Sequence, residues 1–322
     1  MTIEGELTVR LAWDGKRVIG VDVRSTRPFM AQRLFAGKTP AAAAAMAPLL
    51  YSVCEHAQGV AAAGALEAGT GREPAAGTII ARRQEVILEA IQEFLWRLLI
   101  DWPLAMSRGS DVEPVAAVRR VIAPALAALA PVARRIDGEA DPRGDMDVRA
   151  LSTALAEIAG KHVYGVLPEV WLARADTDAI AARARGGQTL PARLLHELLT
   201  DAPDLARSDI ALMPAAQRDA LVAAILPALR GDPGFAQAPT WDGSPVETGA
   251  LARVGAHPFV AAIRSHTGNA VPARFAARLT ELALLLVQLA DATSVDASGA
   301  WADAFAPGAG EGLGAVQTAR GL

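Results

Sequence analysis

Residues 49–69, LLYSVCEHAQGVAAAGALEAG, contain Cys54, the single cysteine among 322 residues. The alanines that follow it favour a helix packed closely against its neighbours. A free cysteine is most often a buried small hydrophobe, and a functional thiol is the alternative interpretation. The segments on either side of this helix decide between the two.

Alternating apolar and polar residues precede the helical region. Residues 3–13 and 17–24 alternate on either side of Asp14-Gly15, which is the strongest short-range signal for a β-hairpin. We therefore predict strands over 3–13 and 17–24, within a hairpin element that spans residues 1–25.

Helical periodicity dominates the rest of the chain. Apolar residues recur at helical spacing over 78–99, opposite an Arg/Glu face. The predicted helices cover residues 30–35, 41–68 with an interruption near Pro48, 78–99, 112–136, 147–164, 176–200, 215–230 and 272–292. The predicted fold class is mainly α (α+β): one domain over 1–322 with a helical core over 40–305 and a glycine-rich tail. Residues 231–256 are irregular, and a loop of this length is usually functional.

Composition excludes several classes of protein. The net charge is -4, and no basic run is longer than a short pair such as Arg82-Arg83, Arg119-Arg120 or Arg134-Arg135. Such pairs are typical of solvated helix faces, so we predict no binding to nucleic acid. One cysteine fits a reducing compartment, and the charged N-terminus does not resemble a secretory signal. The most apolar run, 282–290, is shorter than the roughly 20 residues of a membrane span. We expect a soluble, cytoplasmic protein without membrane insertion.

The common catalytic motifs are missing from the sequence. The five histidines form no H-E-x-x-H pattern, and there is no C-x-x-C pair. The tail sequence G-A-G-E-G-L-G resembles a phosphate-binding loop only loosely, with no strand predicted before it and no helix after it. We therefore predict no nucleotide site.

The segment APTWDGSPVETGALARV carries a dense pattern, P-x-W-D-G-x-P-x-E-x-G-x-L-A-R. It resembles a segment in the large subunit of [NiFe] hydrogenases. The matching residues are Trp241, Asp242, Gly243, Pro245, Glu247, Gly249, Leu251, Ala252 and Arg253, and Ala250 replaces the family's proline.

Three further segments extend the resemblance from residue 2 to residue 322. T-I-E-G-E-L is similar to the family's R-I-E-G-H-L and puts Glu4 on its proton-relaying carboxylate. I-D-W, ending at Trp102, matches the end of a family helix. The final A-R-G-L puts Arg320 on the arginine that packs against the diatomic ligands of the iron.

The same register places Cys54 on the cysteine that bridges nickel and iron in these enzymes. Tyr51 replaces the first cysteine of that pair, Gln58 replaces a histidine, and the family's C-terminal D-P-C-x-x-C is missing. Nickel needs four thiolates there, so no nickel and no hydrogenase activity are expected. An iron carrying CO and two cyanides needs fewer protein ligands, and thiolate is a suitably soft donor. Arginine is a permanent cation whose N–H groups suit the cyanides.

The resemblance implies a HupK-type hydrogenase expression/formation protein, a non-catalytic relative of the large subunit. It would act as a scaffold for an Fe(CN)2CO fragment, with hydrogenase maturation factors and the hydrogenase large subunit as partners. Cys54 would be the metal ligand and Arg320 would hold the cyanides, while Glu4, Trp241, Asp242 and Arg253 would wall the pocket.

Other interpretations stay open. Glu4 is also readable as an exposed strand residue, Arg320 as a solvated arginine, and His56 as a surface or capping residue. The alternative function is a metal-free structural or assembly subunit of a hydrogenase-like or complex I-like assembly. An active hydrogenase requires the missing cysteines.

Overall fold

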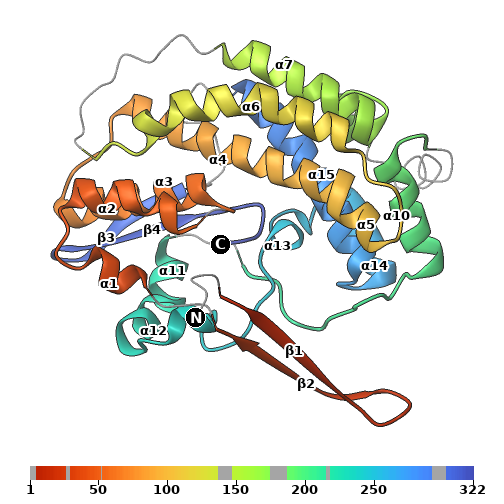
Figure 1. Ribbon diagram of the computed structural model, residues 1–322, viewed down its shortest axis with the longest axis horizontal. Coiled ribbons are helices and arrows are strands. Elements are labelled where there is room, and N and C mark those ends of the chain that lie inside the picture. Colours follow the sequence, from red (N-terminus) through yellow and green to blue (C-terminus); the bar gives the residue numbers. More distant parts are fainter. Residues whose placement is uncertain are drawn as a thin grey trace.

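A computed structural model describes residues 5–26, 30–51, 53–136, 147–174, 187–214, 218–291 and 302–322. The described chain is mainly helical, with one antiparallel hairpin near each end (Figure 1). The strands are β1 (Leu7–Trp13), β2 (Val18–Ser25), β3 (Ala302–Gly308) and β4 (Glu311–Val316). The longer helices are α3 (Glu55–Thr70), α4 (Ala76–Trp96), α6 (Val112–Ala133), α7 (Val148–Ala159), α10 (Leu190–Asp201), α14 (Pro258–Thr267) and α15 (Val271–Asp291).

Shorter helical segments connect these elements. The α-helical ones are α1 (Ala31–Phe35), α2 (Pro40–Met46), α5 (Trp102–Ala105), α8 (Pro168–Ala173), α11 (Arg218–Ala224), α12 (Leu226–Gly231) and α13 (Ala250–Val254). The 3-10 turns are η1 (Pro48–Leu50) and η4 (Phe235–Gln237), and the π-helical turns are η2 (Arg97–Asp101) and η3 (Gly160–Tyr164).

The predicted N-terminal hairpin is confirmed, with a later start. β1 begins at Leu7 rather than at residue 3, and β2 runs from Val18 to Ser25, one residue later at each end than the predicted 17–24. The Asp14 side chain accepts the N–H groups of Lys16 and Arg17, and Gly15 takes a φ of 97°. This turn chemistry explains why Asp14-Gly15 predicted the hairpin.

The predicted break near Pro48 is also confirmed. α2 begins after Thr39, whose side chain caps Ala42 N–H at 3.3 Å, and η1 follows at Pro48. α3 starts directly after Cys54 and ends at Gly71, whose φ of 68° is a left-handed helix end that glycine adopts without strain. Cys54 is therefore the residue that precedes a helix, not one inside it.

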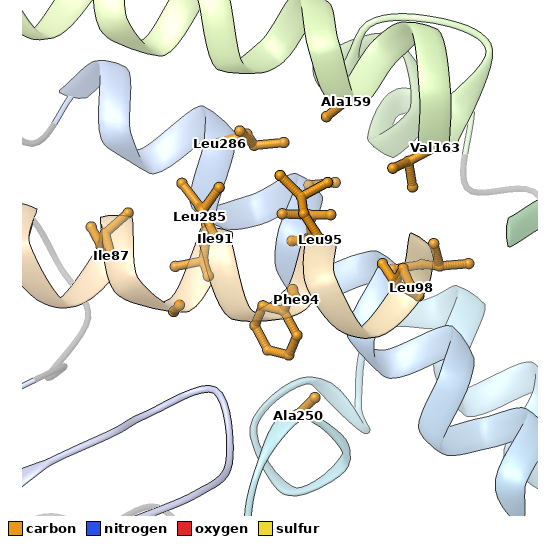
Figure 2. Packing of buried hydrophobic residues seen from close by; sticks show 14 of the residues in the cluster. Ile87, Ile91, Phe94, Leu95, Leu98, Ala159, Val163, Ala250, Leu285 and Leu286 are labelled. Atoms are coloured by element: carbon orange, nitrogen blue, oxygen red, sulfur yellow. The ribbon is translucent and has the colours of Figure 1, made fainter. Parts of the chain in front are cut away.

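Helix α4 lies at the centre of the core. Its apolar side chains Ile87, Ile91, Phe94, Leu95 and Leu98 pack toward α15, α7 and η3, with α13 on the other side (Figure 2). The partners there are Leu285 and Leu286 of α15, Ala159, Val163 and Ala250. The amphipathic pattern over 78–99 thus corresponds to a central helix of the core.

The remaining helix predictions differ mostly at their ends. The helix over 112–136 becomes α6, that over 147–164 becomes α7 with η3, and that over 272–292 becomes α15. The segment 215–230 splits into α11 and α12, because Pro227 removes a helical hydrogen-bond donor. For 176–200, α10 covers the second half, and 175–186 lie outside the described residues. The single-domain assignment stays a prediction.

The glycine-rich tail was wrongly predicted to lack strands. Residues 302–316 form the β3–β4 hairpin, with Ala304 opposite Gly314 and Phe305 opposite Leu313. The helical core therefore ends before residue 305, at α15 in the described chain. β3 ends at Gly308, the first residue of the G-A-G-E-G-L-G sequence, and β4 begins at Glu311 within it, so the segment forms the hairpin turn and the start of β4 and not a phosphate loop.

Glycine lets this hairpin approach α3 very closely. A Cβ at Gly312 would lie 1.7 Å from the Ala65 carbonyl oxygen, and one at Gly314 would lie 2.0 Å from that of Ala61. On the helix side, a Cβ at Gly64 would meet the Ala304 Cβ at 2.8 Å. The tail is therefore glycine-rich because its backbone lies directly against the backbone of α3. Glycine is intrinsically unfavourable in a strand, so this close contact weakens the strand itself.

One helix among the described residues is long and apolar enough to cross a membrane by length and composition, and it is α6. It also has the features of a core helix. Val115, Val118, Ile122 and Leu126 belong to the main apolar cluster, and Pro124 lies inside the helix. The membrane prediction was based on residues 282–290, which belong to α15 and not to α6. That run is mostly buried.

We predict that Gly314→Ala destabilises the protein by about 2–3 kcal/mol, because a methyl group there overlaps the Ala61 carbonyl and forces β4 away from α3. Chemical denaturation monitored by circular dichroism would measure the loss. Gly109→Ala is the matched control, since nothing lies within 4 Å of a Cβ there. Equal stability of the two variants would contradict the close contact.

Candidate functional site

A charged stripe runs along α4 on the face turned toward α3 and the tail. It comprises Arg82, Glu85, Glu89, Glu93 and Arg97, spaced three or four residues apart and so on one side of the helix. The Arg/Glu face predicted over 78–99 is this stripe. The prediction that Arg82 lies on a solvated face is wrong, because it is 7% exposed.

Arg82, the first residue of the stripe, binds near the C-terminal end of α3. Arg82 Nη1 lies 2.6 Å from Glu67 Oε2, and its Nε donates to the Ala133 carbonyl at 2.7 Å. Glu67 is also buried, so each charge depends on the other for stabilisation. Arg119 and Arg120, in contrast, are exposed as predicted.

Glu89, the third residue of the stripe, binds the N-terminal end of α3, beside Cys54. Glu89 accepts the His56 N–H at 2.9 Å with Oε1 and the Ala57 N–H at 3.0 Å with Oε2. These are first-turn N–H groups that the helix itself cannot pair. Cys54, half-buried, occupies the N-cap position with a φ of -134°. A carboxylate from another helix therefore fixes the backbone next to the thiol.

His56 faces the protein interior, so its prediction as a surface residue is wrong. Its Nδ1 lies 2.5 Å from Glu85 Oε1, which also receives Arg134 Nη2 at 3.1 Å. Burial lowers the pKa of His56, but the carboxylates of Glu85, Glu89 and Glu55 outweigh that effect and raise it above its usual value. The His56 ring thus gives the fully buried Glu85 carboxylate a hydrogen-bonding partner.

Glu89 is the titratable group with the clearest perturbation near Cys54. Burial raises its pKa to about 7, and the His56 and Ala57 N–H bonds counteract only part of this effect. Near neutral pH its charge therefore depends on small changes in its surroundings.

Glu93, the fourth residue of the stripe, forms a salt bridge with Arg320 among the last residues of the chain. Arg320 Nη2 lies 2.8 Å from Glu93 Oε1, which also accepts Arg97 Nε at 2.9 Å. Arg320 is half-exposed, and a guanidinium has further N–H donors to offer. Glu89 and Glu93 are one helical turn apart, a rise of about 6 Å. Adjacent turns of α4 therefore hold the segment next to Cys54 and the side chain of Arg320.

The end of the I-D-W motif extends the same surface. Asp101 accepts the Trp96 indole N–H at 3.0 Å and pairs with Arg97 Nη1 at 2.7 Å. Trp102 packs edge-on against Phe275 of α15, with ring centroids 5.1 Å apart, and Arg278 lies over its other side. The motif thus joins the end of α4 to α15.

Two residues of the loop over 241–253 form paired salt bridges with α15. Glu247 binds Arg274 through two N–O contacts of 2.6 and 2.7 Å. Arg253 binds Glu281 with Nε and Nη2, the latter at 2.9 Å. Arg274 and Glu281 are seven residues apart, so they lie on one face of α15. Arg253 was predicted to wall a pocket, and in the structure it anchors this loop.

The loop also touches the tail. Arg253 Nη1 donates to Gln317 Oε1 at 3.0 Å. A Cβ at Gly321 would lie 1.6 Å from Thr248 Oγ1, so only glycine fits after Arg320. The loop and the tail, which the sequence marked as two motifs, are in direct contact.

Trp241 and Asp242 lie elsewhere on the loop. Trp241 and Ser244 exchange backbone hydrogen bonds of 2.9 and 3.0 Å around a tight turn, and Asp242 takes a φ of 49° there. The Asp242 side chain is exposed, and its N–H donates to the Ala224 carbonyl of α11. These bonds hold the two residues at the turn and against α11. Glu4 lies outside the described residues.

Within the described ranges, no group of three or more His, Cys, Asp or Glu side chains is arranged to hold a metal ion. A cavity of about 980 Å³ lies between η3 and α10, and another of about 720 Å³ lies between α3, α11 and β3. Neither is lined by Cys54 or Arg320. The candidate site is the part of α4 where Glu89 holds the segment beside Cys54 and Glu93 pairs with Arg320.

Sequence reasoning missed the residues that assemble this surface, namely Glu89, Glu93, Glu281 and Gln317. A signal for the first two existed. Acidic residues at 85, 89 and 93 repeat every four residues on one side of the helix, where like charges destabilise it unless other segments pair with them. Nothing in the sequence indicated which distant segments they bind.

Three curated proteins illustrate what the chain is similar to. The hydrogenase expression/formation protein HoxV of Cupriavidus necator is 29% identical over 338 aligned positions, covering all of this chain and 79% of HoxV. HupV of Azotobacter chroococcum is 30% identical over 239 positions, covering 69% of this chain and 68% of HupV. HupK of Bradyrhizobium diazoefficiens is 29% identical over 323 positions, covering 99% of this chain and 77% of HupK. No family model matches the chain.

The buried pair between Arg253 and Glu281 gives a stability prediction. Glu281→Gln leaves a largely buried arginine without its charge partner and is expected to cost about 3 kcal/mol. Thermal and urea unfolding would measure this loss. The control is Glu311→Gln, which removes an exposed partner of Arg230 and should change stability by less than about 1 kcal/mol. Similar losses in both variants would contradict the difference in burial.

Glu89 gives a pH prediction. Its folded pKa of about 7 exceeds the ordinary value of 4.5, so its contribution to stability is complete below pH 4.5 and is lost as the pH rises through 7. The full loss is on the order of 3 kcal/mol. Glu89→Gln should remove this part of the dependence. Denaturant titrations of both proteins between pH 4.5 and 8 would measure it, and parallel curves would argue against the shifted carboxyl.

Proposed function

Because the chain belongs to the family of hydrogenase expression/formation proteins, we propose that it is a non-catalytic maturation scaffold that holds an Fe(CN)2CO fragment as cargo for a hydrogenase. The names of its relatives support a maturation role. The cargo and its ligands are our proposal, as is the resemblance of the fold to the hydrogenase large subunit.

One observation carries the cargo proposal. Adjacent turns of α4 hold the chain beside Cys54 through Glu89 and the side chain of Arg320 through Glu93. We infer from these two attachments that a soft sulfur donor and a permanent cation share one surface. A lone cysteine filling a gap in the core would have no need of such an arrangement.

The chemistry of the fragment suits these two side chains. Iron that already carries CO and two cyanides has few open positions, and the Cys54 thiolate would take one of them. The cyanides are anionic acceptors, and Arg320 would donate to them with N–H groups beyond the one facing Glu93. Glu89 and the first turn of α3 would keep the thiolate next to a helix N-terminus, where negative charge is favoured.

The other parts of the prediction enter the proposal in modified form. Arg253 would support the site by fixing the tail through Gln317, not by touching the cargo. Trp241 and Asp242 would act, if at all, at the outer end of the loop. Glu4 remains a proposed wall residue. The proposed location is the cytoplasm, with maturation factors and the hydrogenase large subunit as partners.

A second function has its own support. The described residues contain no metal-binding cluster, and the loop residues Glu247 and Arg253 are engaged in salt bridges with α15. These features also suit a metal-free assembly subunit that provides a rigid surface to its partners. The two functions differ in whether the purified protein carries CO and cyanide.

Infrared spectroscopy of the protein purified without oxygen from cells that make hydrogenase tests the proposal. We expect CO and cyanide stretching bands in the wild type, their loss in Cys54→Ser, and shifted cyanide bands in Arg320→Gln. Arg218→Gln, at an exposed salt bridge with Asp303, is the control and should leave the bands unchanged.

Circular dichroism would check that each variant is folded. Bands that persist unchanged in folded Cys54→Ser would refute the ligand assignment. A wild type without bands, from cells with active hydrogenase, would favour the metal-free function.

A further inference from the structure

The N-terminal hairpin projects away from the helical body (Figure 1). It exposes a set of large apolar side chains that are 42–66% accessible, namely Leu7, Val9, Leu11, Trp13, Val18, Ile19, Val21 and Val23. The strand register puts Val9 opposite Val23 and Leu11 opposite Val21. Side chains alternate between the two faces of a strand, so Leu7, Val9, Leu11, Trp13, Val21 and Val23 share one face, and Val18 and Ile19 lie at the register shift beside Trp13.

The opposite face of the hairpin is polar. Thr8 stands opposite Arg24, and Arg10 stands opposite Asp22. Between Leu7 and Ser25 there are four basic side chains and two acidic ones, giving a net charge of +2 in a chain whose net charge is -4. The hairpin is therefore an apolar ribbon backed by positive charge.

Such a ribbon is not stable by itself. A two-stranded hairpin in water is marginal unless a third strand, a helix or another surface covers its apolar face. Among the described residues, β1 and β2 pair only with each other, and their apolar face is open to solvent. A continuous apolar face of this kind marks a site of protein interaction.

The size of the ribbon argues against a second copy as its cover. A strand of seven residues is roughly 23 Å long, and two strands are roughly 10 Å wide, so one face covers about 230 Å². A stable interface needs about 800 Å² from each partner. Two hairpins stacked face to face would fall well short of that. A partner with a groove would cover the apolar face together with both edges of the hairpin and so bury more of it than a second hairpin could.

We propose that this hairpin docks into an apolar groove bordered by carboxylates on the hydrogenase subunit that receives the cargo. The apolar face, from Leu7 to Val23, would fill the groove. Arg10, Lys16, Arg17 and Arg24 would meet the carboxylates at its border, which is the charge that complements them. The identity of the partner rests on the proposed function, whereas the docking surface rests on the hairpin itself.

The experiment measures binding of the full-length protein to the purified precursor of the hydrogenase large subunit, for example by biolayer interferometry. We expect Leu11→Lys to weaken binding at least about tenfold, because it places a charge in the apolar contact. Thr8→Lys, on the polar face of the same strand, is the matched control and should bind within about twofold of wild type. Higher salt should weaken the wild-type complex.

Infrared spectra of the same samples separate this inference from the cargo proposal. Leu11→Lys that loses binding but keeps the CO and cyanide bands supports the hairpin as a docking surface. Binding that depends on Leu11 in a protein without bands would refute the cargo and leave the docking surface standing.

Three results would overturn the inference. The first is equal binding by wild type and Leu11→Lys. The second is a wild type that does not bind the precursor at all. The third is self-association or membrane binding that depends on Leu11. A dimer seen by light scattering and abolished by Leu11→Lys would assign the face to a second copy. Attachment to phosphatidylglycerol vesicles that Leu11→Lys abolishes would assign it to a membrane.

Discussion

The structure depends on a charged stripe that is buried along its central helix. Removing Glu85, Glu89 and Arg82 from water is unfavourable unless each finds a partner of good geometry. α3, the end of α6 and the chain's last residues supply those partners. The positions of these segments relative to α4 are therefore set by electrostatic pairing, while the opposite face of the same helix sets the apolar core.

α15 has an equivalent role for the loop over 241–253. On α15, Arg274 pairs with Glu247 of the loop, and Glu281 pairs with Arg253. Because the two pairs have opposite orders of charge, only one alignment of the loop along α15 satisfies both. This segment, which runs into the short helix α13, is held against α15 by these two pairs. Because the loop also contacts Gln317 and Gly321, the order imposed by α15 passes on to the tail.

Local signals in the sequence predicted local structure well. Asp14-Gly15 between alternating runs gave the first hairpin, and helical periodicity gave α4, α6 and α15, because turn chemistry and periodicity act over a few residues. The second hairpin escaped prediction because its glycines weaken the strand signal, and their purpose appears only when α3 lies against them. The partners of Glu89, Glu93 and Arg253 escaped for the same reason. Contacts between residues far apart in the chain leave no regular spacing in the sequence from which they could be predicted.

The contact between β4 and α3 joins segments that almost the whole chain separates. Closing so large a loop is slow, because its entropy must be lost before the contact is made, and the helices between form their own local contacts sooner. The surface between Cys54 and Arg320 should thus be among the last parts of the molecule to form. By the same logic it is among the first to open, since the tail can detach from α3 while the packing around α4 stays intact.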